Sequence, residues 1–398
     1  MSQPPWLQSS LQQSKLPVIL QTLESRELLR ESARTTRIEP SSNPHTRLYL
    51  DLRHSRIPSK ILAHYSCAVG QRPLYKRHNR YLALEPYDRT RVLVPTPAHG
   101  QPNSEAGDTS SGTLQCRYLN ANWVRELAGG KWWIAGQAPL PIATHAFLTL
   151  CMYPVALPST ASTTSSHASP MRRVQTIVQL TPMVEGGRRR AHPYFPTYPS
   201  SQNMVVYPEH GCDAPPIHVF NDSQEVTEDA QCIKTDLRLR WGDVKAGDQG
   251  EFRVTHLFYT AWPDFGVPKD NRSILCFARL VEALNNPHIS HLTEDSNVSP
   301  PILIHCSAGV GRTGSFIALS SLLRAYGLLS SPHPSPSLRP TVAPSLPVSP
   351  LGPLPRNLDD DLIAKEIDAL REQRPSMVQR QEQVVWVYTA LFDAFNGL

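Results

Sequence analysis

The sequence lacks a long hydrophobic run. No stretch of its 398 residues approaches the ~18 to 20 uninterrupted apolar residues that a membrane-spanning helix needs. The first residues, MSQPPWLQSSLQQSKL, have neither the charged start nor the apolar centre of a secretory signal. We therefore expect no membrane span and a cytoplasmic location, and the sequence leaves a nuclear location open.

Cysteine pairs are also lacking. The seven cysteines are an odd number and lie far apart, with no C-x-x-C pair and no spacing typical of zinc ligands. This pattern argues against a disulfide framework and against a metal site. We expect neither a metal nor a cofactor.

An excess of one charge is nearly absent. The chain has 39 Lys and Arg against 34 Asp and Glu, for a formal net charge of +5, and the one short basic cluster is Arg188 to Arg190. Nucleic-acid-binding domains usually carry a broad basic patch or stripe. We expect no nucleic-acid partner.

Proline is plentiful, and it gathers in particular segments. The 38 prolines are about twice the average usage of ~5%. Biased composition near residues 95–113, 157–171 and 330–356 predicts disordered insertions, the last of them with repeated Ser-Pro and P-x-x-P patterns. We expect an N-terminal helical segment over residues 1–52, partly flexible, followed by one domain over residues 53–398.

Short β-type runs alternate with helical patterns along this domain. Apolar residues at helical spacing predict one or two helices within residues 17–56, one over 274–284, one after Gly314, and helices over 359–395 with a break at Pro375. Period-2 alternation over 251–260 predicts a strand with one buried face. The remaining predicted strands are residues 132–135, 176–180, 218–220, 233–239 and 302–304. Such a mixture indicates a single α/β (α+β) domain on a mixed sheet.

The strongest motif joins the last of these strands to a helix. The sequence runs from Ile302 to Gly314 as ILIHCSAGVGRTG. Small residues let successive backbone N–H groups turn inward as an anion-binding nest, and the following helix aims its positive end at the same point. This loop is suited to a phosphate, and its binding residues are Ser307, Ala308, Gly309, Val310 and Gly311.

Cys306 lies at the base of this nest. Cysteines at such positions have pKa values of roughly 3.5 to 7.5, which makes them nucleophiles at neutral pH. Arg312 can hold two phosphoryl oxygens with its planar fork, Thr313 can donate to the cysteine sulfur as it leaves, and His305 can fix the loop. The alternative is a structural cysteine in a Gly-rich turn. It would require the strand, the glycines, the arginine and the helix of this motif to occur together by chance. A nucleotide-binding G-x-x-x-x-G-K-S loop is excluded because the lysine is missing.

His305 to Gly314 resembles the signature of the tyrosine-specific, cysteine-dependent protein phosphatases. The resemblance implies a phosphatase-type fold, a highly twisted central mixed sheet flanked by helices. It also implies hydrolysis of phosphotyrosine in proteins through a phosphocysteine, without a metal, and a role in signalling. The biased insertions resemble those of fungal-type members.

Two further motifs resemble the family's mobile loops. Residues 262–268, WPDFGVP, resemble the loop that brings in the general acid. The resemblance makes Asp264 the proton donor to the leaving group and then the base toward water, with Trp262 and Phe265 beside it. The run from Asn79 to Tyr81 resembles the phosphotyrosine recognition loop, where Tyr81 would stack on the substrate ring and set a deep pocket.

Supporting residues follow from the same resemblance. Glu185 is implied as a partner of the signature arginine, and Arg190 stands where the family usually has lysine. Gln379 would position the attacking water and Gln383 would assist, although a polar helix start is an equally good interpretation of Gln383. No residue at the main catalytic positions departs from the family pattern.

One departure from the family pattern lies in the recognition loop. Leu82 and Ala83 follow Tyr81 where many members carry a charged residue and then an aspartate that anchors the substrate backbone. Because of this exchange, the resemblance implies neither how a peptide docks nor which peptide sequence is preferred.

Two other functions remain as alternatives. An inactive phosphotyrosine-binding domain would typically have lost a catalytic residue, and here none is lost. A phosphoinositide or dual-specificity phosphatase tends to carry lysines inside the signature loop, whereas Ser307, Ala308 and Val310 are neutral.

Partners follow from the substrate class and from the last insertion. We expect phosphotyrosine-containing proteins as partners. The Ser-Pro steps at Ser331, Ser335 and Ser349 suit a proline-directed kinase, and the P-x-x-P runs within 330–356 suit an SH3-type domain. A neutral spacer is an equally good interpretation of this segment.

Overall fold

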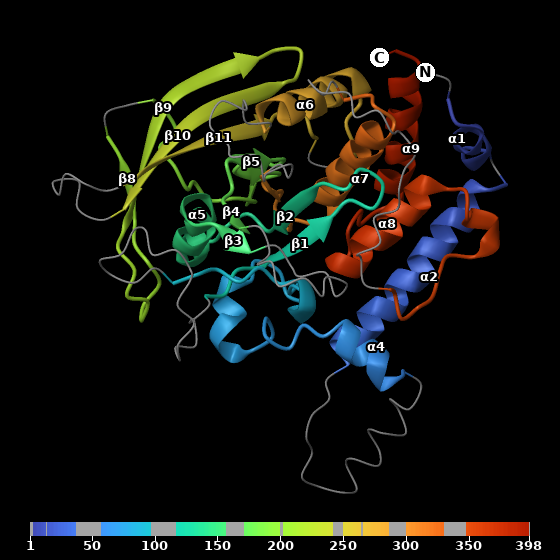
Figure 1. Ribbon diagram of the computed structural model, residues 1–398, viewed down its shortest axis with the longest axis horizontal. Coiled ribbons are helices and arrows are strands. Elements are labelled where there is room, and N and C mark those ends of the chain that lie inside the picture. Colours follow the sequence, from blue (N-terminus) through green and yellow to red (C-terminus); the bar gives the residue numbers. More distant parts are fainter. Residues whose placement is uncertain are drawn as a thin grey trace, which may run out of the picture.

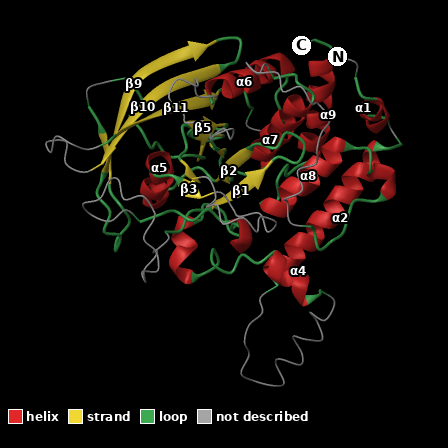
Figure 2. Cartoon of the chain, viewed as in Figure 1, coloured by secondary structure: helices red, strands yellow, loops and turns green. Residues whose placement is uncertain are grey.

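A mixed β-sheet forms the centre of the computed structural model (Figures 1 and 2). The structure describes residues 3–12, 14–36, 57–96, 117–156, 171–199, 202–241, 250–263, 266–285, 300–329 and 348–397. Within these residues, eight strands join in the order β1-β2-β12-β5-β11-β10-β9-β8. The strand bounds are β1 Ala121–Arg125, β2 Trp132–Gly136, β5 Thr176–Gln179, β8 Met204–Val206, β9 Ile217–Thr227, β10 Cys232–Trp241, β11 Glu251–Tyr259 and β12 Ile302–His305. Two small hairpins lie apart from this sheet, β3 (Val155–Ala156) with β4 (Met171–Arg172) and β6 (Val184–Glu185) with β7 (Arg188–Arg189).

The middle of the sheet is parallel and its flanks are antiparallel. β12 pairs in parallel with β2 and with β5, and β5 pairs in parallel with β11. Strands buried on both faces in this way are uniformly apolar. In β12, Ile302 and Ile304 contribute to the buried cluster on one face and Leu303 to the cluster on the other. The C-terminal end of β12 is therefore fixed from both sides, and the Cys306 loop begins there.

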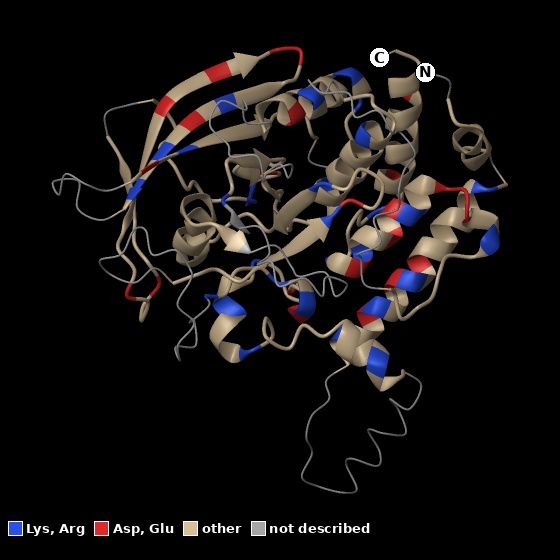
Figure 3. Cartoon of the chain, viewed as in Figure 1, with Lys and Arg blue, Asp and Glu red and all other residues tan. Residues whose placement is uncertain are grey.

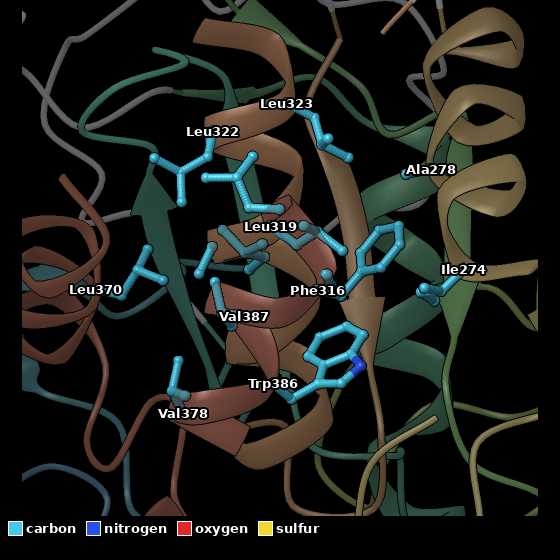
Figure 4. Close-up of a cluster of buried hydrophobic side chains, with 14 of the residues drawn as sticks. Ile274, Ala278, Phe316, Leu319, Leu322, Leu323, Leu370, Val378, Trp386 and Val387 are labelled. Atoms are coloured by element: carbon cyan, nitrogen blue, oxygen red, sulfur yellow. The ribbon is translucent and has the colours of Figure 1, made fainter. Parts of the chain in front are cut away.

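Helices cover both faces of the sheet. The helix bounds are α1 Pro5–Ser10, α2 Leu16–Thr35, α4 Ser59–His64, α5 Thr144–Met152, α6 Asn271–Leu284, α7 Gly311–Ala325, α8 Leu362–Gln373 and α9 Gln381–Phe395. The 3-10 helices are η1 Pro73–His78, η2 Asp88–Thr90, η3 Pro141–Ala143 and η4 Arg356–Leu358. Figure 4 shows Phe316 of α7 beside Ile274 of α6 and Trp386 of α9. Because α7 packs on both neighbours through such side chains, the loop at its N-terminus is held at a fixed place.

The expected fold class is confirmed. The structure is a mixed α/β domain with helices flanking the central sheet. The strand over 251–259 differs in one respect from the predicted single buried face. Val254 and His256 are buried as predicted, but Leu257 and Tyr259 on the opposite face are buried as well. Over its second half the strand pairs with β5 as well as with β10, and there both of its faces are buried.

Helix α5 is absent from the sequence-based prediction. All nine of its residues, Thr144–Met152, are buried. A helix buried all round shows no amphipathic period, so periodicity does not reveal it.

The N-terminal helices belong to the same core as the rest of the domain. Leu7, Ile19 and Leu23 lie in the buried cluster that α7 and α9 form. The boundary expected at residue 52 therefore does not separate two cores. Residues 37–56 lie outside the described residues.

Buried ion pairs join α2 to α8, where acidic and basic residues face one another (Figure 3). The guanidinium of Arg30 is fully buried and lies 2.6 Å from Asp368 and 2.7 Å from Glu372. Arg26 contacts the other oxygen of Asp368 at 2.8 Å. Burial acts to raise the pKa of Glu372, but hydrogen bonds from His64 and Arg30 outweigh it and hold the pKa at about 2. These charges fix the N-terminal helix to the domain.

The last expected insertion ends earlier than predicted. Arg26 donates to the carbonyl oxygens of Leu351 and Gly352, Ser349 donates to Glu372 at 2.9 Å, and Leu354 is buried. Residues 348–356 thus pack against α2 and α8, because their backbone carbonyls satisfy a buried arginine. The predicted insertions over 97–113, 157–170 and 330–347 lie outside the described residues. Among the described residues, no helix has the length and apolar character that crossing a membrane requires.

We expect Arg30→Ala to lower the free energy of unfolding by about 3 to 5 kcal/mol, because it leaves Asp368 and Glu372 without their buried partner. Urea titration with linear extrapolation measures this free energy. The cost should shrink as the pH falls toward about 2, where Glu372 gains a proton and its ion pair with Arg30 is lost.

Lys15→Ala is the matched control for this prediction. Lys15 pairs at 3.3 Å with Asp360, whose side chain is 61% exposed, so its loss should cost less than about 1 kcal/mol. Equal effects of the two variants would show that the buried ion pairs do not hold the helix.

Candidate active site

The loop between β12 and α7 encloses Cys306. This residue follows β12 directly and is 5% exposed. The backbone N–H of Gly309 donates to its sulfur at 3.2 Å, and α7 begins at Gly311 with its N-terminus toward the loop. One backbone amide of the loop therefore points at the cysteine sulfur.

Two glycines allow the loop to approach the backbone of its neighbours. Gly309 has φ +72°, and a Cβ at this position would overlap the carbonyl oxygen of Gly136 in β2. A Cβ on Gly314 would overlap the backbone nitrogen of Val378, just ahead of α9. Only glycine fits at either position, because the obstacles are backbone atoms that cannot swing away.

The buried side chain of Arg374 donates hydrogen bonds to the backbone of the Cys306 loop. Arg374 is fully buried, its Nε donates to the carbonyl of Gly309 at 2.8 Å, and its Nη2 donates to the carbonyl of Ala308 at 3.1 Å. Burial lowers the pKa of Arg374 to about 10. A peptide's C=O and N–H point in opposite directions, so fixing these two carbonyls turns the next two amides toward the pocket.

The same guanidinium reaches the recognition loop. Arg374 donates to Asn122 at 2.8 Å and to Asn120 at 3.0 Å, and Asn120 in turn donates to Asn79 at 2.9 Å. Tyr118 donates to Asn79 at 2.7 Å. One buried network thus sets the spacing between the Cys306 loop and the loop that carries Tyr81. The sequence analysis assigned Arg374 no role.

Arg312 is held by a carboxylate and by the flank of the candidate acid loop. Its Nη1 pairs with Glu185 and donates to the carbonyl of Leu180 at 3.1 Å, and its Nη2 donates to the carbonyl of Pro263 at 3.0 Å. Glu185 also lies 3.5 Å from Nε of Arg190. The structure therefore brings Arg312, Glu185 and Arg190 together beside the Cys306 loop.

Tyr81 lies across the mouth of the same loop. Its hydroxyl is 2.8 Å from Oγ of Ser307, and that Oγ donates to the carbonyl of Arg190 at 2.8 Å. Since the only proton of Ser307 goes to a carbonyl, the hydroxyl of Tyr81 is the donor in this pair. The tyrosine ring is thus fixed at one wall of the pocket.

His305 is buried and neutral. Burial lowers its pKa to about 4, so the ring carries no charge at pH 7. Its Nδ1 lies 3.1 Å from the carbonyl oxygen of Cys306 and must donate, which leaves Nε2 to accept from Tyr194 at 2.9 Å. The ring fixes the backbone of Cys306.

The remaining residues of the motif are Val310 and Thr313. Val310 is buried, and its carbonyl accepts from Val378 at 3.1 Å. Thr313 is fully buried, and within the described residues its hydroxyl has no hydrogen-bond partner, Cys306 included. The predicted hydrogen bond to the sulfur is therefore not formed in this state, and the hydroxyl is free to make one.

The two glutamines lie at different places. Gln383 is buried beside Gly311, where a Cβ would lie 2.9 Å from its Nε2. Gln379 is exposed and lines a surface groove with Leu20 and Glu24 of α2. Of the two, the structure brings Gln383 against the Cys306 loop.

Asp264 and Phe265 lie outside the described residues. Trp262 ahead of them is buried, packs on Trp386 with ring centroids 5.2 Å apart, and donates to the carbonyl of Gly266 at 3.3 Å. Both flanks of this short segment are thus fixed close to Arg312.

Within the described ranges, His, Cys, Asp and Glu side chains form no group of three that could hold a metal ion. The site thus contains a thiol that accepts from a backbone N–H, with the guanidinium of Arg312 held beside the same loop.

Comparisons with known proteins agree with this geometry. A family model described as Protein-tyrosine phosphatase matches residues 75–154 and 169–328. The human tyrosine-protein phosphatase non-receptor type 14 is 27% identical over 330 residues, which cover 79% of this chain and 24% of that protein. The rat tyrosine-protein phosphatase non-receptor type 21 is 27% identical over 341 residues, 85% of this chain and 23% of that protein. This chain therefore spans about a quarter of the length of these relatives.

A solved structure shares the fold. It concerns the structural basis of the PTPN18 fingerprint on distinct HER2 tyrosine phosphorylation sites, and it matches with a TM-score of 0.54 and 21% identity. The match covers 83% of this chain and 88% of that chain.

We expect Gly309→Ala to lower the free energy of unfolding by about 1 to 3 kcal/mol more than Gly130→Ala does, because its Cβ overlaps backbone atoms. Both glycines have positive φ, but a Cβ on Gly130 meets nothing within 4 Å, so the control carries only the conformational strain, about 1 kcal/mol. Urea unfolding measures both. Thermal stabilisation by tungstate, an oxyanion of phosphate shape, should disappear in Gly309→Ala alone; its survival would show that the loop tolerates the side chain.

Proposed function

The chain belongs to the protein-tyrosine phosphatase family, and from this premise we propose that it hydrolyses phosphotyrosine in proteins through a phosphocysteine intermediate. The observation that carries the proposal is the cysteine sulfur in the loop ahead of α7, where it accepts from the Gly309 N–H. A tetrahedral phosphate dianion matches this cradle in shape and charge.

In the first step, the thiolate of Cys306 attacks the phosphorus of the substrate. A sulfur–phosphorus bond forms, the bond from phosphorus to the tyrosyl oxygen breaks, and Asp264 gives its proton to that oxygen. Arg312 holds two phosphoryl oxygens as the charge moves. Glu185 orients Arg312 through their ion pair. The role of Asp264 rests on the family resemblance.

In the second step, water attacks the phosphocysteine. Asp264 takes a proton from the water, the phosphorus–oxygen bond forms, and the sulfur leaves with its electron pair. The free hydroxyl of Thr313 would donate to that sulfur, which lowers its basicity. Gln383, which lies beside Gly311, would orient the water, and Gln379 would join it by turning inward from α2.

The pocket wall favours a tyrosyl substrate. Tyr81 is fixed by Ser307 at the mouth of the loop, and its ring would stack on the substrate ring, with Phe265 on the acid loop closing the other side. A phosphoserine side chain is too short to bring its phosphate to the base of such a pocket. The neutral residues Ser307, Ala308 and Val310 give no extra cations for the further phosphates of a phosphoinositide.

We also propose that the protein is a fungal-type member of the family. It would form one phosphatase domain that includes the N-terminal helices, and it would be located in the cytoplasm with access to the nucleus. Phosphotyrosine proteins would be the partners and substrates, in signalling. The segment 330–356 would contact a proline-directed kinase or an SH3-type domain. Neither a metal nor another cofactor is required by the two steps above.

We expect the wild-type protein to hydrolyse a phosphotyrosyl peptide in EDTA and to leave the matched phosphoseryl peptide nearly untouched. Cys306→Ser should abolish turnover, because a hydroxyl in this place is a far weaker nucleophile, and Asp264→Ala should lower kcat by roughly 10²- to 10⁴-fold. Release of inorganic phosphate measures both.

Cys212→Ser is the control, because Cys212 is half-buried and lies in a loop apart from the site, and it should keep full turnover. If a folded and reduced wild type released no phosphate but bound the peptide, the proposed hydrolysis would be wrong and the chain would be an inactive phosphotyrosine-binding domain.

We expect Tyr81→Ala to raise KM for the phosphotyrosyl peptide by roughly tenfold, since it removes a stacking contact of about 0.5 to 1.5 kcal/mol and its buried area. Tyr81→Phe keeps the ring and loses only the hydrogen bond to Ser307, so its KM should rise less than about threefold. Steady-state kinetics on one peptide series measures both. Equal effects would show that the ring does not contact the substrate.

A further inference from the structure

The hydroxyl of Ser349 fastens the 348–356 segment to helix α8. It donates to the carboxylate of Glu372 at 2.9 Å, and it accepts from the backbone N–H of Leu351 at 3.2 Å. The N–H of Gly352 donates to the carbonyl of Ser349 at 3.0 Å, and Gly352 has φ +74°. This one side chain therefore closes a turn of the segment and holds that turn against α8.

The carboxylate of Glu372 has other donors besides Ser349. Arg30 donates to the same oxygen at 2.7 Å and Tyr65 donates to it at 2.8 Å, while His64 lies 3.0 Å from the other oxygen. Although burial acts to raise it, the pKa of Glu372 is about 2 because of these neighbours. The carboxylate is thus charged at pH 7, and it would repel a second anion in the place of the serine hydroxyl.

The arginine of α2 that binds the segment has no donor left for such an anion. A guanidinium has five N–H groups. In Arg26, two of them bind the carboxylate of Asp368. The other three bind backbone carbonyls of the segment, those of Leu351, Gly352 and Pro353. An anion beside Ser349 would have to take these donors away from the segment.

The sequence around Ser349 suits a kinase. Pro350 follows it, and it is the Ser-Pro serine of the last insertion that lies within the described residues. Ser349 is half-buried, whereas Val348 before it is 90% exposed. Local opening of a short surface segment costs much less free energy than global unfolding, so the hydroxyl becomes accessible while the domain stays folded.

We propose that Ser349 is a phosphorylation site and that its phosphate releases the 348–356 segment from α2 and α8. A proline-directed protein kinase transfers the γ-phosphoryl group of ATP to the serine oxygen. The new bond joins phosphorus to Oγ, the bond from phosphorus to the oxygen shared with the β-phosphate breaks, ADP leaves, and the hydroxyl proton passes to the kinase. The phosphoserine carries about −1.5 to −2 charges at pH 7, so repulsion from Glu372 replaces the hydrogen bond.

Release of the segment acts on α8. Arg26 loses three carbonyl acceptors, and the buried side chain of Leu354 becomes exposed. Glu372 loses a donor, and Arg374, which binds the Cys306 loop, follows Glu372 by two residues. The phosphate thus loosens the end of the helix that leads to the candidate site.

From the proposed function, this inference takes only the proline-directed kinase, and it adds the modified serine and the effect of the phosphate. It does not depend on the proposed hydrolysis, because none of its readouts is turnover. Failure of one proposal is therefore distinguishable from failure of the other.

The first test maps the phosphate. A purified proline-directed kinase that modifies the free peptide of residues 343–356 is incubated with ATP and the full chain carrying Ser331→Ala and Ser335→Ala. We expect mass spectrometry to find phosphate on Ser349, and none on Ser349 once Pro350→Ala is added. If the kinase modified the peptide but left Ser349 of the folded chain unmodified, the segment would not open and the proposal would be wrong.

The second test follows the amides of Leu351 and Gly352 by hydrogen exchange. Phosphorylation should speed their exchange by roughly 100-fold, because a hydrogen bond to a charged group is lost and repulsion is added. A serine-directed phosphatase should restore the slow rate. Ser349→Ala is the matched control, since it removes the hydroxyl and adds no charge, and it should speed exchange by about tenfold at most.

Exchange elsewhere in the chain shows how far the effect reaches. The C-terminal end of α8 should exchange faster in the phosphorylated protein. Strands β9 and β10, on the opposite side of the molecule from α2 and α8 (Figure 1), should not change.

Two results would overturn the proposed release. Slower exchange after phosphorylation would show that the phosphate is captured in place, for instance by Arg89, whose Nη1 is buried and has no hydrogen-bond partner among the described residues. Equal exchange in the phosphorylated protein and in Ser349→Ala would show that the added charge does not drive the segment away.

Discussion

The site depends on one buried guanidinium. Arg374 binds the carbonyls of Ala308 and Gly309 and the amide oxygens of Asn120 and Asn122. A charge that is completely buried is costly unless its donors are satisfied, so this residue requires the loop and the asparagines to stay in place together. The Cys306 loop and the loop that carries Tyr81 are therefore parts of one polar network, which depends on α8 and the turn that follows it.

The sheet and the helices make this network possible. β12 lies between β2 and β5, with apolar residues on both faces, so the loop at its end has a fixed origin. α7 packs on α6 and α9, which fixes the direction of its N-terminus. Burial of apolar side chains thus places the amides, and the polar network then sets their orientation.

The sequence predicted the parts whose signal is local. β12, the Cys306 loop and α7 combine residue types that the chemistry demands at adjacent positions. Arg374 as an anchor was not predictable, because its partners Asn120 and Ala308 are far apart in the chain and nothing local marks an arginine as buried. Residues 348–356 were assigned to an insertion by composition alone, although the carbonyl of Gly352 completes the shell of Arg26. Composition reports average solubility and does not show which backbone groups a distant side chain will bind.

Arg312 lies beside the Cys306 loop and donates to the carbonyl of Pro263, at the flank of the segment that carries Asp264. In the mechanism proposed above, the same planar group would also hold the bound anion. By thermodynamic linkage, if the anion binds more tightly when Pro263 is held in place, then the anion must hold Pro263 in place by the same factor. Under that mechanism, anion binding and the position of the chain ahead of Asp264 would form one coupled equilibrium, so that a weaker hydrogen bond to Pro263 would lower the affinity for phosphate.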